Sequence, residues 1–343
     1  MAVRPGERSR ESTGEGANLG DVVIRPERVS DYSAIAGLNY DAFVNWRPTP
    51  FKAEPLLVDI LRHNVLFDPD LSLVAEAAGR VVGHVLFSPF EFVVLGTRQM
   101  GALLAPIGVE PAFQRSGIGR MLIERGHEVA REKGIALSVL CGHPEYYPRF
   151  GYRQRMFSLS GATVRLEARG AQAPDLAERP VLASDLAWIV DAWRRAHGGD
   201  ALAIFPGDGI AQWFNHAASH RSSVITRGGE PVAYVRYKVA RPLAIKEFLV
   251  RDVAAGNVLA FLLRESDRGG GQVTTSLSAD ALEPLFAPSE GVQVSGSPDT
   301  SDAFMLCALD PSNEVLARYC ADVSEGRMLP GLIAFPPILD TDE

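Results

Sequence analysis

A glycine-containing loop between an apolar segment and a helix is the part of this sequence best suited to chemistry. Residues 103–109 form an apolar run of strand length, and a helical pattern starts directly after Gly117-Ile118-Gly119. The first backbone N–H groups of a helix lack intrahelical acceptors, and the helix dipole favours negative charge there. Neither glycine has a Cβ that would keep a ligand from the backbone. The loop is therefore predicted to bind a pyrophosphate.

Two common nucleotide-binding loops do not fit this segment. No Lys-Ser/Thr follows the glycines, as a P-loop requires, and there is no G-x-G-x-x-G dinucleotide fingerprint. The run Gln114-Arg115-Ser116-Gly117-Ile118-Gly119 resembles the coenzyme A loop of the GNAT N-acetyltransferases. After it come a helix, a strand and then Tyr147-x-x-x-Gly151-Tyr152, where the family often has Tyr-x-x-x-Gly-Phe. The resemblance covers residues 103–152.

The resemblance implies that acetyl-CoA is the acyl donor and that no metal takes part. The backbone of Ile107 and Val109 would hold the pantetheine arm, and an N–H near Val109 would serve the oxyanion. The pyrophosphate would lie on the amides from Gln114 to Arg120. The positions carried over as cofactor-binding are Ile107, Gly108, Val109, Gln114, Arg115, Ser116, Gly117, Ile118, Gly119 and Arg120.

Tyr147 matches the family tyrosine that acts as general acid beside the coenzyme sulfur, and Tyr146 is the alternative if the register slips by one. For the general base we rank His143 first, because it follows the strand expected beside the acceptor. A water relay to a backbone carbonyl is an equal alternative. The other candidates are His84, Glu76 and Glu91, and, in Eis-like relatives, a C-terminal carboxylate that corresponds to Glu343.

The order of predicted elements indicates an α+β fold with two tandem GNAT-like domains, whose mixed, mostly antiparallel sheets are flanked by helices. A strand, two helices, three antiparallel strands and a strand–helix–strand unit occupy residues 22–166, and a weaker version of this order follows. The second copy lacks the glycine loop and has Asp252 there instead. This combination resembles the Eis-like acetyltransferases without their sterol-carrier-like domain.

The expected organisation has five parts. They are a disordered tail (1–20), a catalytic GNAT domain (21–167), a linker (168–180), a degenerate GNAT-like domain (181–309), and a C-terminal helix with a docking tail (310–343). We expect the second domain to wall the acceptor pocket, with aromatic side chains as candidates for its lining. These are Trp193, Phe205, Trp213 and Phe214.

Composition narrows the partners. The formal charge of −8 disfavours nucleic acid, and no apolar run is long enough to span a membrane. Three widely spaced cysteines without a C-x-x-C pair argue against a zinc site and fit a reducing, cytoplasmic location. The sequence is compatible with a homo-oligomer but does not indicate one.

The favoured function is acetyl transfer from acetyl-CoA to a primary amine of a small molecule by direct attack on the thioester. One alternative is a coenzyme A-binding regulatory or scaffold protein without turnover. Another is a protein-lysine acetyltransferase. The sequence does not identify the amine, the general base or whether other acyl-CoA compounds are used.

Overall fold

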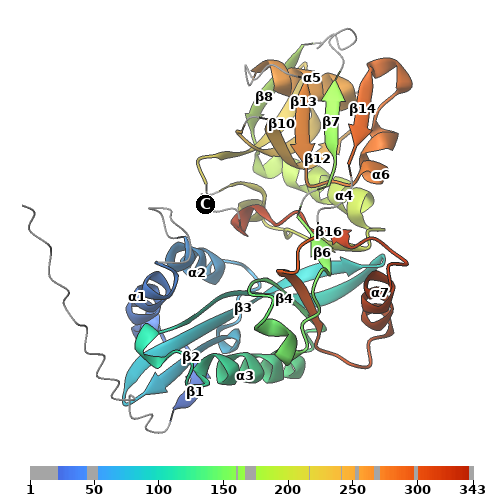
Figure 1. Cartoon of the computed structure of the whole chain (residues 1–343). Coiled ribbons are helices and arrows are strands. Elements are labelled where there is room, and N and C mark those ends of the chain that lie inside the picture. The colour runs from blue at the N-terminus through green and yellow to red at the C-terminus, as the bar shows by residue number, and fades with distance from the viewer. Residues whose placement is uncertain are drawn as a thin grey trace, which may run out of the picture.

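The computed structural model describes residues 22–44, 53–159, 161–166, 175–215, 217–240, 242–251, 255–265, 271–296 and 300–339. They form two seven-stranded sheets flanked by helices, the second above the first in Figure 1, so the α+β prediction is confirmed. No described helix is both long and apolar enough to cross a bilayer. The expected N-terminal tail, residues 168–174 of the expected linker, Asp252 and Glu343 lie outside the described residues.

The first sheet has the strand order β1-β2-β3-β4-β5-β15, with β9 paired to β3. Its strands are β1 (Val23–Pro26), β2 (Ser72–Ala77), β3 (Arg80–Val94), β4 (Thr97–Val109), β5 (Leu137–Cys141), β9 (Leu202–Ile204) and β15 (Phe304–Ala308). The helices α1 (Tyr32–Phe43), α2 (Glu54–Arg62) and α3 (Ile118–Glu132) pack against it. Up to β5 this is the element order expected from the sequence.

The central strands bury side chains on both faces. In β2, Leu73 and Ala75 pack in the core that contains α3, whereas Val74 packs in the core that contains α1 and α2. Successive residues of a strand point to opposite faces, so two cores need apolar residues at successive positions. This explains why these strands read as continuous apolar runs rather than as alternating patterns.

The second sheet has the order β14-β7-β13-β12-β11-β10-β8. Its strands are β7 (Thr163–Leu166), β8 (Leu176–Pro180), β10 (His220–Arg227), β11 (Glu230–Lys238), β12 (Leu243–Val250), β13 (Gln272–Thr275) and β14 (Val292–Ser295). Its helices are α4 (Leu186–His197), α5 (Ala255–Glu265) and α6 (Ala279–Leu282). The remaining elements lie near the junction of the two sheets: β6 (Phe157–Ser158), α7 (Glu314–Ser324) and β16 (Gly331–Leu332).

The same side-chain arrangement starts both units. Arg25 at the end of β1 binds Asp31 at 2.7 Å, and Arg179 at the end of β8 binds Asp185 at 2.7 Å. Each aspartate also accepts the backbone N–H three residues before it, and its arginine lowers its pKa. A serine precedes each of these aspartates, at Ser30 and Ser184, but the aspartates hold the strand-to-helix turns. The shared arrangement supports the tandem reading with specific contacts.

Sheet membership differs from the expected domain boundaries. Strand β7, expected in the first domain, lies between β13 and β14 of the second sheet. Strand β15, expected in the second, pairs antiparallel with β5, and β9 pairs with β3. A strand's own pattern shows that it is half or fully buried but not which edge it pairs with, so the sequence placed these segments by their position in the chain.

Two local sequence patterns are misleading. A proline within a strand usually marks a bulge or an edge, but β3 continues through Pro89, and the register shift lies between Val85 and Phe87. The sequence also predicts a helix over residues 209–220, whereas the structure has a 3₁₀ turn, Ile210–Trp213, before β10 begins. The C-terminal helix was placed correctly: α7 begins at Glu314, and the Asn313 side chain accepts the amide of Leu316 as its cap.

Candidate active site

The loop before α3 presents its backbone amides to solvent. Arg115 and Gly117 both have left-handed backbone torsions, with φ of 63° and 93°. Within the described chain, the amides from Arg115 to Arg120 donate no hydrogen bond to another backbone group. A Cβ added to Gly117 would meet no atom within 4 Å, so the space in front of the loop is open. This cradle suits a pyrophosphate.

The side chains of the loop contribute less than its backbone. Ser116 Oγ donates to the Phe113 carbonyl at 2.5 Å, and Ile118 is buried in the core under α3. Arg115 and Arg120 are both exposed, and Arg120 Nε lies 3.5 Å from the Glu124 carboxylate. A Cβ on Gly119 would lie 2.7 Å from the Tyr146 hydroxyl, so glycine at this position lets Tyr146 lie against the start of α3.

Strands β4 and β5 separate next to this loop. They pair in parallel only from Gly101 to Leu103, whereas the opposite edge of β5 pairs with β15 along its whole length, from Leu137 to Cys141. On β4, Ala105 and Pro106 form a bulge, because pairing with β3 jumps from Leu104 to Ile107. The separated part of β4 therefore keeps one edge free of a neighbouring strand.

The bulge also determines which backbone groups face the gap. Met100 O accepts the amide of Ala136 on the β5 side, whereas the amide of Glu110 donates to Val82 O on the β3 side. Because neighbouring residues of a strand direct these groups to opposite edges, Ile107 and Val109 face the gap. Gln114 Nε2 already donates to Val109 O at 3.1 Å, which leaves the Val109 N–H toward the gap.

A cavity of about 700 Å³ fills the gap between the separated strands. It brings together six of the residues singled out from sequence, namely Ile107, Gly108, Val109, Gln114, His143 and Tyr147. Most of the remaining lining is apolar. Phe304 at the start of β15 and Phe335 and Leu339 in the C-terminal segment complete the wall.

Tyr147 fits the expected general acid. Its ring is buried against Gly142 and Tyr146, and burial raises the pKa of its phenol well above the ordinary value, so it stays protonated. Tyr147 lines the cavity. Tyr146 lies instead against the start of α3, outside the cavity lining.

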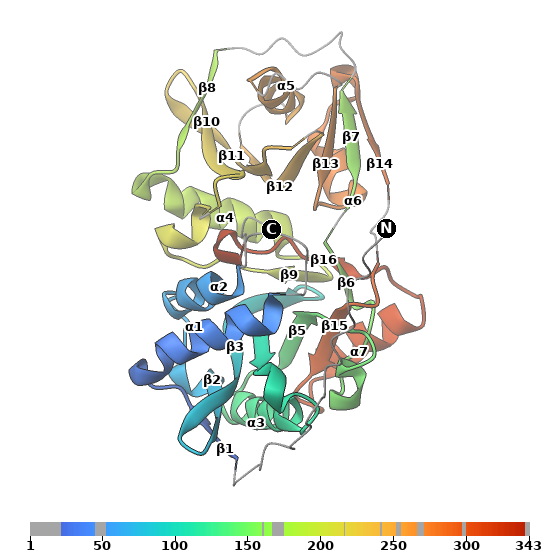
Figure 2. The ribbon, with the colours of Figure 1, turned by 60° about the vertical axis from the view of Figure 1, so that its left-hand side comes forward.

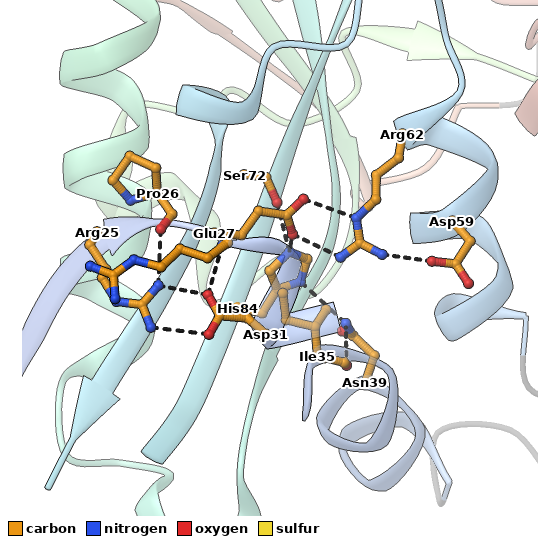
Figure 3. Close-up of polar contacts among 11 residues, drawn as sticks. Arg25, Pro26, Glu27, Asp31, Ile35, Asn39, Asp59, Arg62, Ser72 and His84 are labelled. Carbon is orange, nitrogen blue, oxygen red and sulfur yellow. Dashed lines mark hydrogen bonds and ion pairs between the residues drawn. The ribbon is translucent and has the colours of Figure 1, made fainter. Parts of the chain in front are cut away.

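Of the four side chains considered as general base, only His143 lines this cavity. His84 is fully buried between Asn39 at 3.2 Å and Ser72 at 3.1 Å, and burial lowers its pKa to about 3 (Figure 3). Glu76 pairs with Arg25 at 2.7 Å, and Glu91 pairs with Arg194 at 3.0 Å. These three side chains hold elements together and do not reach the candidate site.

Figure 3 shows the buried network around His84 in the layer behind β4. Arg62 of α2 binds the Glu27 carboxylate through two nitrogens, at 2.9 and 2.8 Å, and the Glu27 carboxylate lies 3.8 Å from His84. His84 is paired with Gly108 on β4, where a Cβ would lie 3.0 Å from the Asn39 amide oxygen. The network therefore fixes α1 and α2 against the strand that lines the cavity.

Glu54 was not singled out from the sequence. Among the described lining residues it is the one carboxylate, and it lies at the first position of α2. An acidic residue at a helix start usually indicates only a favourable helix dipole. Its position on the cavity depends on the packing of α2 over β4, which no local pattern reveals. Within the described residues, no group of three or more side chains could hold a metal ion.

The aromatic residues expected in the acceptor pocket lie elsewhere. Phe205 and Trp213 are buried with Tyr234 in a separate apolar core between α4 and the second sheet, and Trp193 packs on Phe205. Phe214 is 40% exposed. Two residues of the expected second domain do line the cavity, Ala303 and Phe304. Phe304 begins β15, a strand of the first sheet, and Ala303 directly precedes it.

At the corresponding helix start of the second unit, the described residues differ from the loop before α3. The Glu290 carboxylate accepts the amide of Gly256 in the first turn of α5 at 2.9 Å, and also the amide of Ala287 at 2.7 Å. A side-chain anion thus binds at the start of α5, where the described start of α3 offers free amides.

Comparison with known proteins gives a consistent picture. Residues 24–155 match the family described as the acetyltransferase (GNAT) domain. The chain is 37% identical over 109 residues to the uncharacterized N-acetyltransferase YjhQ of Escherichia coli, a match that covers 32% of this chain and 60% of that protein.

Two solved structures extend the comparison. A GNAT family acetyltransferase from Brucella melitensis, solved with acetyl-CoA, is 37% identical, with 38% of this chain and 82% of that one covered and a TM-score of 0.35. Eis1 from Mycobacterium abscessus shares the fold over 84% of this chain and 74% of its own, with 20% identity and a TM-score of 0.56.

Proposed function

Because this chain belongs to the GNAT superfamily of N-acetyltransferases, we propose that it transfers the acetyl group of acetyl-CoA to a primary amine of a small molecule. The observation that carries the proposal is the cavity between β4 and β5. It joins a free strand edge, a protonated tyrosine and a carboxylate beside an open phosphate cradle. Acetyl-CoA supplies an activated thioester, and the chain's own residues perform the remaining tasks.

The backbone binds and orients the donor. The amides from Arg115 to Arg120 hold the pyrophosphate, and the free edge of β4 at Ile107 and Val109 holds the extended arm. The Val109 N–H stabilises the oxygen on which negative charge develops. Neither role depends on a side chain.

Proton transfer involves both sides of the cavity. As the amine nitrogen forms its bond to the acetyl carbon and the carbon–sulfur bond breaks, Tyr147 donates its proton toward the departing sulfur. The proton released by the amine goes to His143 or Glu54, the two other groups in the lining suited to accept it. The Glu54 carboxylate also favours a cationic acceptor over a neutral or anionic one.

The size of the cavity favours a small acceptor. Phe335 and Leu339 cover it from the C-terminal segment, and Phe304 adds a wall from β15. A lysine on a folded protein would have to reach past these side chains. The mostly apolar wall therefore suits a free amine with an apolar body better than a protein surface.

The test is a thiol-release assay with acetyl-CoA and a panel of small primary amines, with a lysine peptide alongside. We expect turnover on at least one small amine and about 10²-fold lower kcat in Tyr147→Phe, the usual scale for a general acid. Tyr146→Phe is the matched control and should keep its kcat. Tight acetyl-CoA binding without turnover on any amine would favour the regulatory alternative, and preference for the peptide would favour a protein-lysine acetyltransferase.

A further inference from the structure

The second unit keeps a cavity at the place where the first unit has its candidate site. Strands β12 and β13 pair in parallel only from Leu243 to Ile245, after which β12 continues to Val250 and β13 ends. A cavity of about 400 Å³ opens there. His197 ends α4 as Phe43 ends α1, and each lines the cavity of its own unit. The repeated fold has thus kept the separated strands after losing the phosphate cradle.

The lining of this second cavity is charged. The His197 ring lies between two carboxylates, with Nδ1 2.8 Å from Asp200 and Nε2 3.1 Å from Glu247. Burial alone would lower the pKa of His197, but the two carboxylates raise it to about 10, so it is a cation at neutral pH. Asp280 of α6 also lines the cavity and is exposed to it and to solvent. Arg236, buried opposite Glu247 on β11, is a second cation beside this group. Two cations therefore face three carboxylates, and the excess negative charge is that of Asp280 at the mouth of the cavity.

The remaining wall is largely apolar. Trp193 packs on His197 with ring centroids 4.8 Å apart, and Leu277 and Leu332 line the cavity from two other segments. Negative charge over an apolar floor repels phosphates and carboxylates and attracts cations. The chemistry that fits is a small organic ammonium with an apolar body.

One chain segment connects the two cavities. Residues 328–332 and Ala334 line the second cavity, and Phe335 and Leu339, directly after them, line the first. Figure 2 shows this C-terminal segment between the two sheets, beside β9 and α4. A molecule in the second cavity would therefore touch the segment that forms the wall of the acceptor pocket.

We propose that the second cavity binds a small organic ammonium compound and that its occupancy alters acceptor affinity in the first cavity. The binding part stands on the geometry of the second cavity alone, whose lining includes β9 and the C-terminal segment. The coupling part rests on the proposed function, because it is measured through acetyl transfer.

Methyl NMR of methionine tests binding without any activity. Met328 lines the second cavity, and no described residue lining the first is a methionine. The probe is N,N-dimethyl-2-phenylethylamine, a tertiary amine that cannot form a stable amide, and Met328→Leu assigns the signal. We expect a saturable shift of the Met328 methyl in the full-length chain. Asp280→Lys should weaken the affinity about tenfold, whereas Asp191→Asn, an exposed carboxylate of α4 outside both cavities, should not.

The neutral alcohol 2-phenylethanol tests the role of charge and should bind at least tenfold more weakly. An unmoved Met328 signal, equal binding of the alcohol, or full affinity in Asp280→Lys would each overturn the site. Coupling is tested through acetyl transfer. N,N-dimethyl-2-phenylethylamine should change the KM for the acceptor amine more in the wild-type chain than in Asp280→Lys. Equal changes in both chains would mean simple competition in the first cavity and would overturn the coupling. If no amine is acetylated, the NMR titration still decides the site.

Discussion

A substitution at Leu306 tests whether β15 unfolds as part of the first unit. The residue is fully buried at the centre of β15, opposite Val139 of β5, and its backbone exchanges hydrogen bonds of 2.8 and 3.0 Å with Arg153. It belongs to the core that also contains residues of α1 and α2. Leu306→Ala should therefore destabilise the first unit although the residue follows the second unit in the chain.

The expected magnitude follows from the burial. Leu306→Ala removes three carbon groups, each worth about 0.8 kcal/mol of transfer free energy, and leaves a void that adds to the loss. Because the two flanking strand segments limit collapse around the void, we expect a loss of about 3 kcal/mol in the free energy of unfolding. Leu182→Ala, at a side chain that is 50% exposed, should cost well under 1 kcal/mol.

The assay is urea unfolding at 25 °C with and without acetyl-CoA. A ligand at a hundred times its Kd stabilises the unit that binds it by about 2.7 kcal/mol. If β15 unfolds together with the first unit, acetyl-CoA should raise the midpoint of Leu306→Ala as it raises that of the wild-type chain. A transition of Leu306→Ala that is destabilised but insensitive to bound acetyl-CoA would refute the reasoning. A loss below about 1 kcal/mol would refute it as well.

Three further predictions concern the cradle, the cavity and the buried histidines. Acetyl-CoA should bind with a stoichiometry near one per chain by calorimetry, and a measured value near two would contradict this prediction. Gly117→Glu should abolish binding, because it adds bulk and negative charge at the pyrophosphate. Glu54→Gln should raise KM for cationic amines about tenfold while acetyl-CoA affinity stays unchanged, and an equal rise for neutral amines would argue against charge recognition. The free energy of unfolding should fall as the pH decreases from 6.5. Burial lowers the pKa of His84 to about 3 and that of His127 to about 4, so the unfolded chain binds more protons than the folded chain in this range. In urea titrations at pH 7 and 5, His84→Gln should reduce the difference in unfolding free energy between the two pH values.

The phosphate cradle could be predicted from sequence because its chemistry is local. Two glycines, a preceding strand and a following helix determine where the free amides lie, and all these features fall within about twenty residues. The same is true of Tyr147, whose spacing from Gly151 indicated its place. The structure puts both beside the gap between β4 and β5. Local spacing was therefore sufficient to place these residues beside the gap.

The acceptor side could not be predicted in this way, because it is assembled from distant segments. Glu54 comes from α2, Phe304 from β15 and Leu339 from the C-terminal segment. Each has an ordinary local explanation, namely a helix start, a strand residue and an apolar tail. Only their packing against β4 gives them a common cavity, and that packing depends on partners more than two hundred residues apart.

The same physical difference separates what the two units share from what they do not. The Arg25–Asp31 and Arg179–Asp185 pairs occur in both units, and each holds the first strand to the first helix of its own unit. The open amides before α3 hold no other element, whereas the Glu290 carboxylate accepts an amide at the start of α5. The gap between β12 and β13 follows from the short stretch over which they pair, and its lining is charged. A cavity at this place is thus a consequence of the sheet and does not require a phosphate loop.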